Sequence, residues 1–170
     1  GLDRAGRVLY IGTFSKTVFP GLRLGCIVLP PDLVDVFTAA RTLTDLHAPL
    51  TDQMVLADFI AEGHFERHVR RMRTLYGERQ KILVAESQKH LAGFLTVEPS
   101  DAGMHLIGWL PKGLDDRKVS DALAAADVKA APISRYTARR FPRGRLMLGY
   151  TAFNERQTRD GIKRLAKVLT

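Results

Sequence analysis

The sequence predicts an α/β chain in two unequal parts joined by a long helix, and three observations lead to this class. Two apolar, strand-like runs, residues 7–12 and 24–29, flank a loop of small and hydroxylated residues. Apolar side chains then recur at three- and four-residue spacing over residues 65–91, which is typical of one long amphipathic helix. Beyond residue 93, short strand-like runs alternate with helical patterns, which indicates an α+β lobe. We expect domain limits at 1–50, 51–92 and 93–170.

The first part is expected to be a strand–loop–strand unit followed by a helix. Residues 7–12 are apolar and end on a glycine, so we expect a short buried strand. The second run, residues 24–29, is stopped by a pair of prolines, which lack a backbone donor. Asp32 then lies where an N-cap belongs, so a helix of about a dozen residues is expected from Leu33 onward.

The middle part is expected to be helical. Thr51 can cap a helix whose apolar positions suit burial, namely Met54, Val55, Ala57, Phe59 and Ile60. Gly63 interrupts the pattern before the long helix of residues 65–91 begins. Because this helix runs between the two strand-bearing parts, we expect it to bridge them.

The last part is expected to contain two helices and four short strands. One helix is expected near residues 117–126. The final amphipathic helix covers residues 155–169, with Asn154 as its N-cap. The strand-like runs are residues 94–97, 105–110, 128–131 and 146–150.

The composition is that of a globular protein, with 45% hydrophobic and 26% charged residues in a chain of 170. The longest apolar runs are far too short to span a bilayer, and the polar start of the chain has no signal-peptide pattern. These features favour a cytoplasmic protein. The single cysteine, Cys26, lies in an apolar run, so we expect it to be a buried small hydrophobe rather than a reactive thiol.

The net charge of +8 directs attention to nucleic acids as partners. Basic residues are densest at 67–73 and again at 135–145, but aromatic residues do not alternate with them as in a base-stacking surface. No zinc-finger spacing or helix-turn-helix pattern accompanies them. We therefore interpret the basic residues as a solvated helix face and a surface for contacts between domains.

The pattern that carries chemistry is centred on Lys16, in the loop between the first two strands. A lysine held behind a strand among small residues can be desolvated enough to act as a neutral amine, as imine formation with an aldehyde cofactor requires. Thr13 and Ser15 flank it with hydroxyl groups, and Arg23 follows seven residues later. A proline–glycine pair can turn the chain so that Arg23 points back, and a guanidinium group matches phosphate oxygens in bidentate geometry. The alternative is an exposed loop lysine beside an unrelated arginine, which the combined pattern disfavours.

The segment Gly12–Gly25 closely resembles the cofactor-lysine segment of fold-type I aminotransferases, and especially that of the aminotransferase-like domains of MocR-type regulators in the GntR superfamily. Residues 53–73, followed by Tyr76, are similar to the signature helix of that subfamily. The resemblance continues in the segments Ala102–Leu106, Trp109–Pro111 and Leu146–Tyr150. It therefore covers essentially the whole chain.

This resemblance implies the C-terminal portion of a fold-type I, pyridoxal-phosphate-dependent transferase. Residues 1–50 would end its large domain, residues 51–92 would form the bridging helical region, and residues 93–170 would form an α+β small domain. Lys16 would be the catalytic residue that holds pyridoxal 5'-phosphate as a Schiff base. The cofactor phosphate would be held by Thr13, Ser15 and Arg23. The resemblance also implies a homodimer, an amino compound as effector, and DNA contact only through a winged-helix domain that would precede this chain.

In the resembled family, an aspartate that pairs with the pyridine nitrogen and a ring that stacks on the cofactor both precede the lysine strand. Only fifteen residues precede Lys16, and none of them fits either role. The isolated chain is therefore expected to bind the cofactor weakly or not at all, and to be inactive as an enzyme.

The closing strand departs from the pattern of the resembled aminotransferases, in which an arginine of this strand receives the substrate carboxylate. At that place, three residues before Tyr150, this chain has Met147. Arg145 lies two residues earlier and, by strand alternation, on the same face, so it is the candidate substrate-binding residue. A surface role at the strand edge is the open alternative. The departure argues against amino-acid transamination.

Three histidines are candidate ligands. His64 and His68 lie four residues apart on a helix, but the metalloprotease glutamate and a third ligand are absent, so no metal site is expected. His105 follows a glycine turn that could approach a cofactor, but we expect a core or domain-contact histidine.

Three functions remain in competition. The first is the effector-sensing domain of a GntR/MocR-type transcriptional regulator. The second is part of a pyridoxal-phosphate-dependent class I/II aminotransferase, and the third is a module that serves only dimerisation. The signature helix and Met147 favour the first. A winged-helix pattern encoded upstream would support the regulator, and its absence would support the enzyme.

Overall fold

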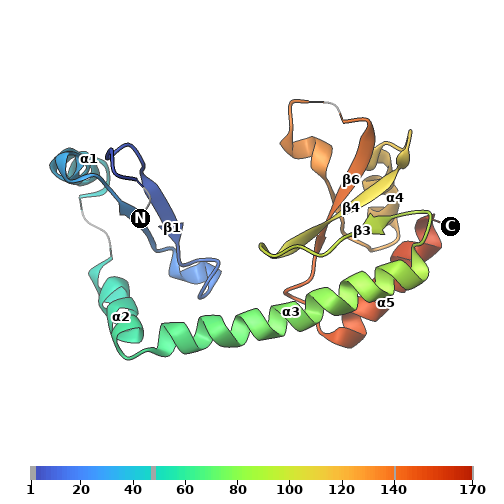
Figure 1. The fold of residues 1–170 in the computed structure, drawn as a ribbon, viewed down its shortest axis with the longest axis horizontal. Coiled ribbons are helices and arrows are strands. Elements are labelled where there is room, and N and C mark those ends of the chain that lie inside the picture. The colour runs from blue at the N-terminus through green and yellow to red at the C-terminus, as the bar shows by residue number, and fades with distance from the viewer. Residues whose placement is uncertain (1–2, 47–48, 140, 170) are drawn as a thin grey trace. The chain divides into compact units, whose positions relative to one another are not determined.

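The computed structural model describes residues 3–46, 49–139 and 141–169, and the chain separates into two compact units (Figure 1). The first unit is Gly1–Met72 and the second is Arg73–Thr170. The division falls inside the longest helix, α3 (His64–His90), which confirms the long helix expected from the apolar spacing. The three domain limits expected from the sequence stay a prediction.

The first unit is built on an antiparallel hairpin of β1 (Tyr10–Thr13) and β2 (Gly25–Val28). The N–H of Phe14 donates to the carbonyl oxygen of Leu24 over 3.0 Å, which extends the ladder by one bond beyond the strands. Both expected strands therefore exist, but the first begins three residues later than the apolar run that predicted it. The hairpin positions the loop that carries the candidate lysine.

The two strands approach so closely that Gly25 must be a glycine. A Cβ atom on Gly25 would lie 2.8 Å from the carbonyl oxygen of Gly12, closer than carbon and oxygen atoms pack. Thr13 is the ladder partner of Gly25, so the loop begins at this narrow end of the hairpin.

The hairpin is exposed, which corrects the expectation of a buried strand over residues 7–12. Every residue of β2 is exposed, including Cys26, so the expectation of a buried cysteine was wrong as well. The physical reason is that two strands form a single layer with little to pack across it. Among the described residues of this unit, burial is confined to Leu24, Pro30 and Leu56.

Two helices follow the hairpin, α1 (Val34–Asp45) and α2 (Leu50–Ala61). The expected caps were wrong. Asp32 lies inside a short 3₁₀ helix, η2 (Pro31–Leu33), and α1 starts directly after that turn with no side-chain cap. Thr51 lies in the first turn of α2 rather than before it, because that helix begins at Leu50.

The expectation that α2 is a buried helix was also wrong. Leu56 is its only buried residue, and Met54 and Val55 keep 60% and 62% of their surfaces exposed. The side chain of Gln53 supports the first turn, since its Nε2 donates to the carbonyl oxygen of Pro49 over 3.3 Å.

The second unit is a four-stranded antiparallel sheet packed against helices. The strand order is β3-β4-β6-β5, and every neighbouring pair is antiparallel. The strands are β3 (Thr96–Val97), β4 (His105–Lys112), β5 (Ala131–Pro132) and β6 (Arg143–Gly149). The strands expected at 105–110 and 146–150 are confirmed as β4 and β6, whereas the run at 128–131 contributes only its last residue to β5.

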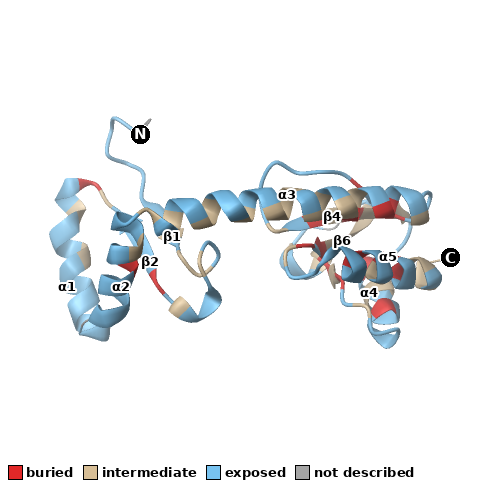
Figure 2. Ribbon diagram, turned by 90° about the horizontal axis from the view of Figure 1, so that it is seen from below, coloured by how far each residue is buried: buried red, intermediate tan, exposed pale blue. Residues whose placement is uncertain are grey.

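One face of this sheet carries the core, and Figure 2 shows buried residues gathered on β4, β6 and the helices beside them, while α1 and α2 are exposed almost throughout. The covering helices are α4 (Asp116–Ala125), α5 (Glu155–Leu169) and the second half of α3. Strand alternation divides the residues: Leu106, Leu110, Leu146 and Leu148 are buried in the core. Ile107, Trp109, Arg145 and Met147 lie on the other face and are half-buried.

The N-terminus of α5 is capped as expected. The N–H of Gln157 donates to Oδ1 of Asn154 over 2.9 Å, and Oε1 of Gln157 accepts the N–H of Asn154 over 2.9 Å. This reciprocal pair is a capping box, which satisfies two backbone donors that a helix start otherwise leaves open.

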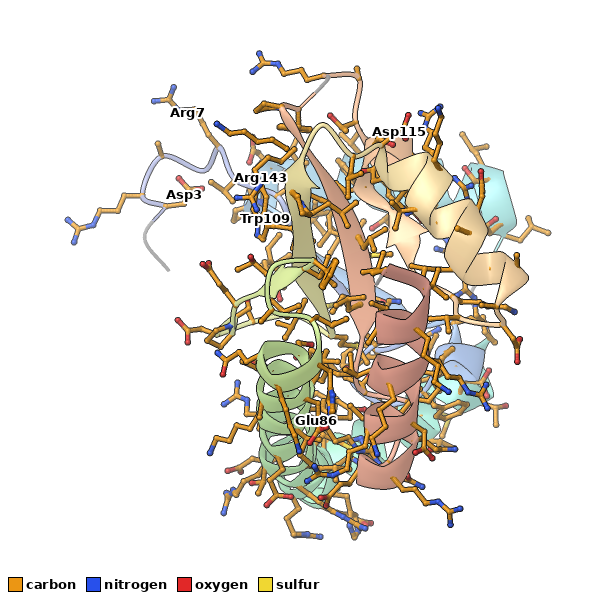
Figure 3. The ribbon with its side chains drawn as sticks, turned by 90° about the vertical axis from the view of Figure 1, so that its right-hand side faces the viewer. Asp3, Arg7, Glu86, Trp109, Asp115 and Arg143 are labelled. Carbon is orange, nitrogen blue, oxygen red and sulfur yellow. The ribbon has the colours of Figure 1, made fainter. Side chains whose placement is uncertain are left out.

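A buried carboxylate joins α3 to α5. Glu86 is only 5% exposed, and it accepts a hydrogen bond from the guanidinium group of Arg159 (Figure 3). His90, one turn further along α3, places its Nε2 3.4 Å from the same carboxylate.

None of the helices in the described part of the chain has the length and apolar character needed to span a membrane.

Candidate functional site

The loop that carries Lys16 leaves β1 after Thr13 and makes one tight turn. The N–H of Val18 donates to the carbonyl oxygen of Phe14 over 2.8 Å, and the N–H of Ser15 donates to the hydroxyl oxygen of Thr13 over 3.2 Å. The second bond orients the Thr13 hydroxyl and leaves its own proton available for a ligand. Thr13 is exposed and Ser15 is half-buried.

Lys16 is exposed at this turn, and it forms no hydrogen bond or ion pair with any of the described residues. The expectation that the loop desolvates its amine was therefore wrong for this chain by itself. The reason is the one that exposes the hairpin: the turn extends from a single two-stranded layer, so the side chain is not enclosed.

Arg23 follows the 3₁₀ helix η1 (Pro20–Leu22), which turns the chain back toward β2. Its φ of +51° lies in the left-handed region, which residues other than glycine rarely adopt. Arg23 lines an open hollow of about 600 Å³ together with residues of α1 and α2, among them Arg41 and Gln53. Of the four predicted residues, Arg23 reaches the wall of this hollow, whereas Thr13, Ser15 and Lys16 do not.

The electrostatics of the loop favour an anion. Residues 8–31 contain no aspartate or glutamate, while Lys16 and Arg23 carry positive charges. The hydroxyl groups of Thr13 and Ser15 add neutral donors beside the amine. This donor set suits a phosphate group together with an electrophile that reacts with amines.

Arg145 lies on β6 opposite Trp109 of β4, and the face it shares with Met147 is the one turned away from the core. Its guanidinium carbon lies 3.5 Å from the ring centroid of Phe141 and 5.2 Å from that of Trp109. Met147 pairs with Ile107 on one side and with Ala131 on the other, so its immediate surroundings on the sheet are apolar. The same-face relationship expected from strand alternation is thus present.

The structure also gathers residues that the sequence did not bring together. An open hollow of about 560 Å³ lies where β4 ends, α4 begins and β6 starts (Figure 3 labels Asp115 and Arg143 there). Its arginines are Arg117, Arg139, Arg143 and Arg145. The only sequence signal was the basic run at 135–145, which does not reveal that Arg117 and an aromatic pair join it.

Asp116 organises this region. The carboxylate is buried, and its Oδ2 accepts the N–H of Ser134 over 3.1 Å and the N–H of Arg145 over 3.2 Å. Burial by itself would raise the pKa of Asp116, but hydrogen bonds from Ser134 and from the Arg145 backbone, with the charge of Arg117, lower the pKa below its ordinary value. Asp116 is therefore a structural carboxylate held ionised by the fold.

The histidines form no metal centre in the part of the chain that is described, since no cluster of three or more histidine, cysteine or carboxylate side chains occurs there. His64 instead contacts Glu62 through Nε2 at 3.0 Å and Arg67 through Nδ1 at 2.7 Å. His105 is exposed at the start of β4, so it is not a core residue.

The basic residues at 67–73 lie on the exposed surface of α3, which agrees with a solvated helix face. Arg70 pairs with Glu66 one turn earlier at 2.6 Å, and both side chains are about three-quarters exposed, at 75% and 77%. Local pairs of this kind stabilise a helix slightly and recognise no partner.

Comparison with known proteins places the chain among pyridoxal-phosphate enzymes and their relatives by similarity. Residues 1–165 match the family "Aminotransferase class I and II". The chain is 44% identical, over 97% of its length, to the "Probable rhizopine catabolism regulatory protein MocR" of Rhizobium meliloti, and it covers 34% of that protein. It is 31% identical, over 97% of its length, to the HTH-type transcriptional regulator YhdI of Bacillus subtilis, of which it covers 35%.

Among solved structures, the kynurenine aminotransferase of Pyrococcus horikoshii superposes with a TM-score of 0.89 at 29% identity. That match covers 99% of this chain and 42% of the enzyme, whose structure was determined in complex with PMP. The chain spans about a third of the length of each of the two curated regulators.

Proposed function

The chain belongs to the aminotransferase class I and II family, and from that premise we propose that it is the cofactor-binding, effector-sensing part of a MocR-type transcriptional regulator. Its fold is that of the fold-type I pyridoxal-phosphate aminotransferases. The chain covers about a third of the length of such regulators. The effector and the DNA contact are therefore proposed for the whole regulator.

Met147 is the observation that carries the proposal for a sensor over an enzyme. It occupies the place on β6 where the resembled aminotransferases carry the carboxylate-binding arginine, and its ladder partners are Ile107 and Ala131. An apolar side chain between apolar neighbours cannot hold a carboxylate, because burying an unpaired charge beside them is costly. An α-amino acid would therefore lack its usual anchor on this strand.

The residues of the hairpin loop fit pyridoxal phosphate by the chemistry of their donors. We assign Thr13, Ser15 and Arg23 to the phosphate, because hydroxyl and guanidinium groups are strong donors to phosphate oxygens and the loop contains no competing carboxylate. The bond from the Ser15 N–H to Oγ1 of Thr13 supports this role, since it holds that oxygen in place and leaves the hydroxyl proton free to donate.

Lys16 is assigned as the residue that bonds to the cofactor. Pyridoxal phosphate supplies an aldehyde that condenses with primary amines. Lys16 supplies such an amine in the hairpin loop, between the hydroxyl-bearing residues Thr13 and Ser15 and the guanidinium-bearing Arg23. Arg145 is assigned to the acidic end of the amino compound, because it lies on the same open sheet face as Met147.

We further propose a homodimer that acts in the cytoplasm and contacts DNA through a winged-helix domain. The first unit supports association, since it leaves large apolar side chains exposed, including Ile11, Leu43 and Leu46 at 73%, 89% and 77%.

A working aminotransferase is the second candidate, supported by the 29% identity to the kynurenine aminotransferase and by the same donor loop.

Absorbance titration with pyridoxal phosphate, carried out on the full-length gene product, tests the assignment of Lys16. The wild type and Lys163→Ala, a control on the exposed surface of α5, should give a new absorbance band that Lys16→Ala lacks. A second measurement follows the affinity of the protein for its operator DNA. If that affinity changes when cofactor and an amine are added, the protein is a sensor rather than an enzyme. Rapid amino-group transfer by a protein that binds no DNA would refute the sensor.

A further inference from the structure

We propose that the basic hollow of the second unit, lined by Arg117, Arg139, Arg143 and Arg145, binds a small oxyanion, either a carboxylate or a phosphate ester. The inference rests on the assignment of Arg145 to the acidic end of the amino compound and extends it to a complete site. It is independent of the cofactor loop, because all residues of the hollow lie between Gly113 and Arg145.

The hollow carries a net positive charge, because its lining has four arginines against two aspartates, Asp115 and Asp116. Asp115 caps the N-terminus of α4, where its Oδ1 accepts the N–H of Arg117 over 2.8 Å and the N–H of Lys118 over 3.4 Å. Asp116 is committed to the backbone N–H groups of Ser134 and Arg145. Among the described residues, no carboxylate forms an ion pair with any of the four arginines.

Arg145 is held in place before any ligand arrives. Its guanidinium group stacks 3.5 Å from the Phe141 ring centroid and also faces Trp109, which restricts the plane of the guanidinium. One terminal nitrogen, Nη2, is buried and has no hydrogen-bond partner among the described residues. A buried charged donor without an acceptor is costly, so an acceptor oxygen brought to this guanidinium would stabilise it.

The neighbouring arginines supply further donors at the same hollow. Arg143 uses Nε on the carbonyl oxygen of Leu110 at 3.0 Å, and Arg117 uses Nε and Nη2 on Ser134 at 3.1 and 3.3 Å. Each of these bonds fixes a guanidinium while leaving other N–H groups of the fork unused. Guanidinium groups held in place around an open hollow match the two or three oxygens of a carboxylate or phosphate. A neutral ligand would leave the positive charges of these arginines unpaired.

The chain contains its own reporter for a test, because Trp109 is the sole tryptophan and lies beside Arg145. Inorganic phosphate and succinate are titrated separately into the 170-residue chain at pH 7, with potassium chloride exchanged to keep ionic strength constant and no pyridoxal phosphate present. We expect a saturable change in tryptophan fluorescence with a Kd on the order of 1 mM or below. Saturation by phosphate alone identifies a phosphate ester, saturation by succinate alone identifies a carboxylate, and saturation by both identifies a general oxyanion site.

Variants show whether the hollow is the site. Arg145→Gln should weaken binding at least tenfold and Arg139→Gln severalfold, whereas Arg156→Gln, a 92%-exposed arginine on α5, should stay within twofold of the wild type. Arg139 is exposed and makes no side-chain hydrogen bond in the described structure, so its variant keeps the test valid if Arg145→Gln fails to fold. Absence of saturation with both anions, or wild-type affinity in Arg139→Gln, would overturn the proposal. Neither result would bear on cofactor binding at Lys16.

Discussion

The carboxylate of Asp116 accepts the backbone N–H of Arg145 over 3.2 Å, across 29 positions of sequence, and so ties the first turn of α4 to the middle of the sheet. The same oxygen also accepts the N–H of Ser134. One buried carboxylate therefore fixes three segments that line the basic hollow, and the position of Arg145 depends on it.

Asp116 should make the stability of the second unit depend on pH. Because its pKa is lowered in the fold, it stabilises the folded state above its unfolded pKa, near 3.8, and this contribution is lost as the pH falls through the lower folded value. Asp116→Asn should reduce the free energy of unfolding at pH 7 by about 1–3 kcal/mol. In this variant, the free energy of unfolding should also decrease less steeply between pH 5 and pH 3 than in the wild type.

Urea unfolding followed by tryptophan fluorescence measures both effects. Asp121→Asn is the matched control, since Asp121 is exposed on the same helix and forms no hydrogen bond in the described structure. Equal pH slopes for Asp116→Asn and the wild type would show that this carboxylate is not the source of the dependence.

Gly144 should be intolerant of any side chain. A Cβ atom there would lie 2.6 Å from the carbonyl oxygen of Leu114 and 3.0 Å from the backbone nitrogen of Asp116, and backbone atoms cannot yield as a flexible side chain can. Gly144→Ala should therefore lower the free energy of unfolding by about 1–3 kcal/mol.

Gly161 provides the opposite case on α5. A Cβ atom on Gly161 would meet no other atom within 4 Å, so Gly161→Ala should stabilise the chain by up to about 1 kcal/mol through helix propensity. Thermal or urea unfolding of the two variants gives the comparison. A loss in Gly161→Ala as large as that in Gly144→Ala would contradict the steric argument.

Arg23→Ala should weaken cofactor binding by the full-length gene product while the fold is kept. A charged hydrogen bond to phosphate is worth roughly 1.5–3 kcal/mol, which corresponds to a ten- to hundredfold rise in Kd. Arg41→Ala is the control in the same hollow, because Nε of Arg41 is already paired with Asp45 at 3.1 Å. Unchanged affinity in Arg23→Ala, measured by absorbance titration, would remove Arg23 from the phosphate site.

Local patterns predicted the parts of the fold whose causes are local. The long helix α3 follows from apolar spacing within a few turns, and the cap of α5 needs only Asn154 and Gln157, three residues apart. The alternation along β4 and β6 likewise follows from the two-residue period of a strand. The caps expected at Asp32 and Thr51 failed because helix starts shift by one or two residues with the preceding prolines.

The sequence by itself determined the order of the elements, the family and the donor-rich loop around Lys16, because these depend on residues that are neighbours along the chain. Only the tertiary structure decided that Cys26 and Lys16 are exposed, since burial depends on what packs across a layer. It alone also placed Trp109, Phe141 and Arg145 together and left Nη2 without a partner. Contacts between segments far apart in sequence are set by packing and desolvation over the whole unit, which no local pattern encodes.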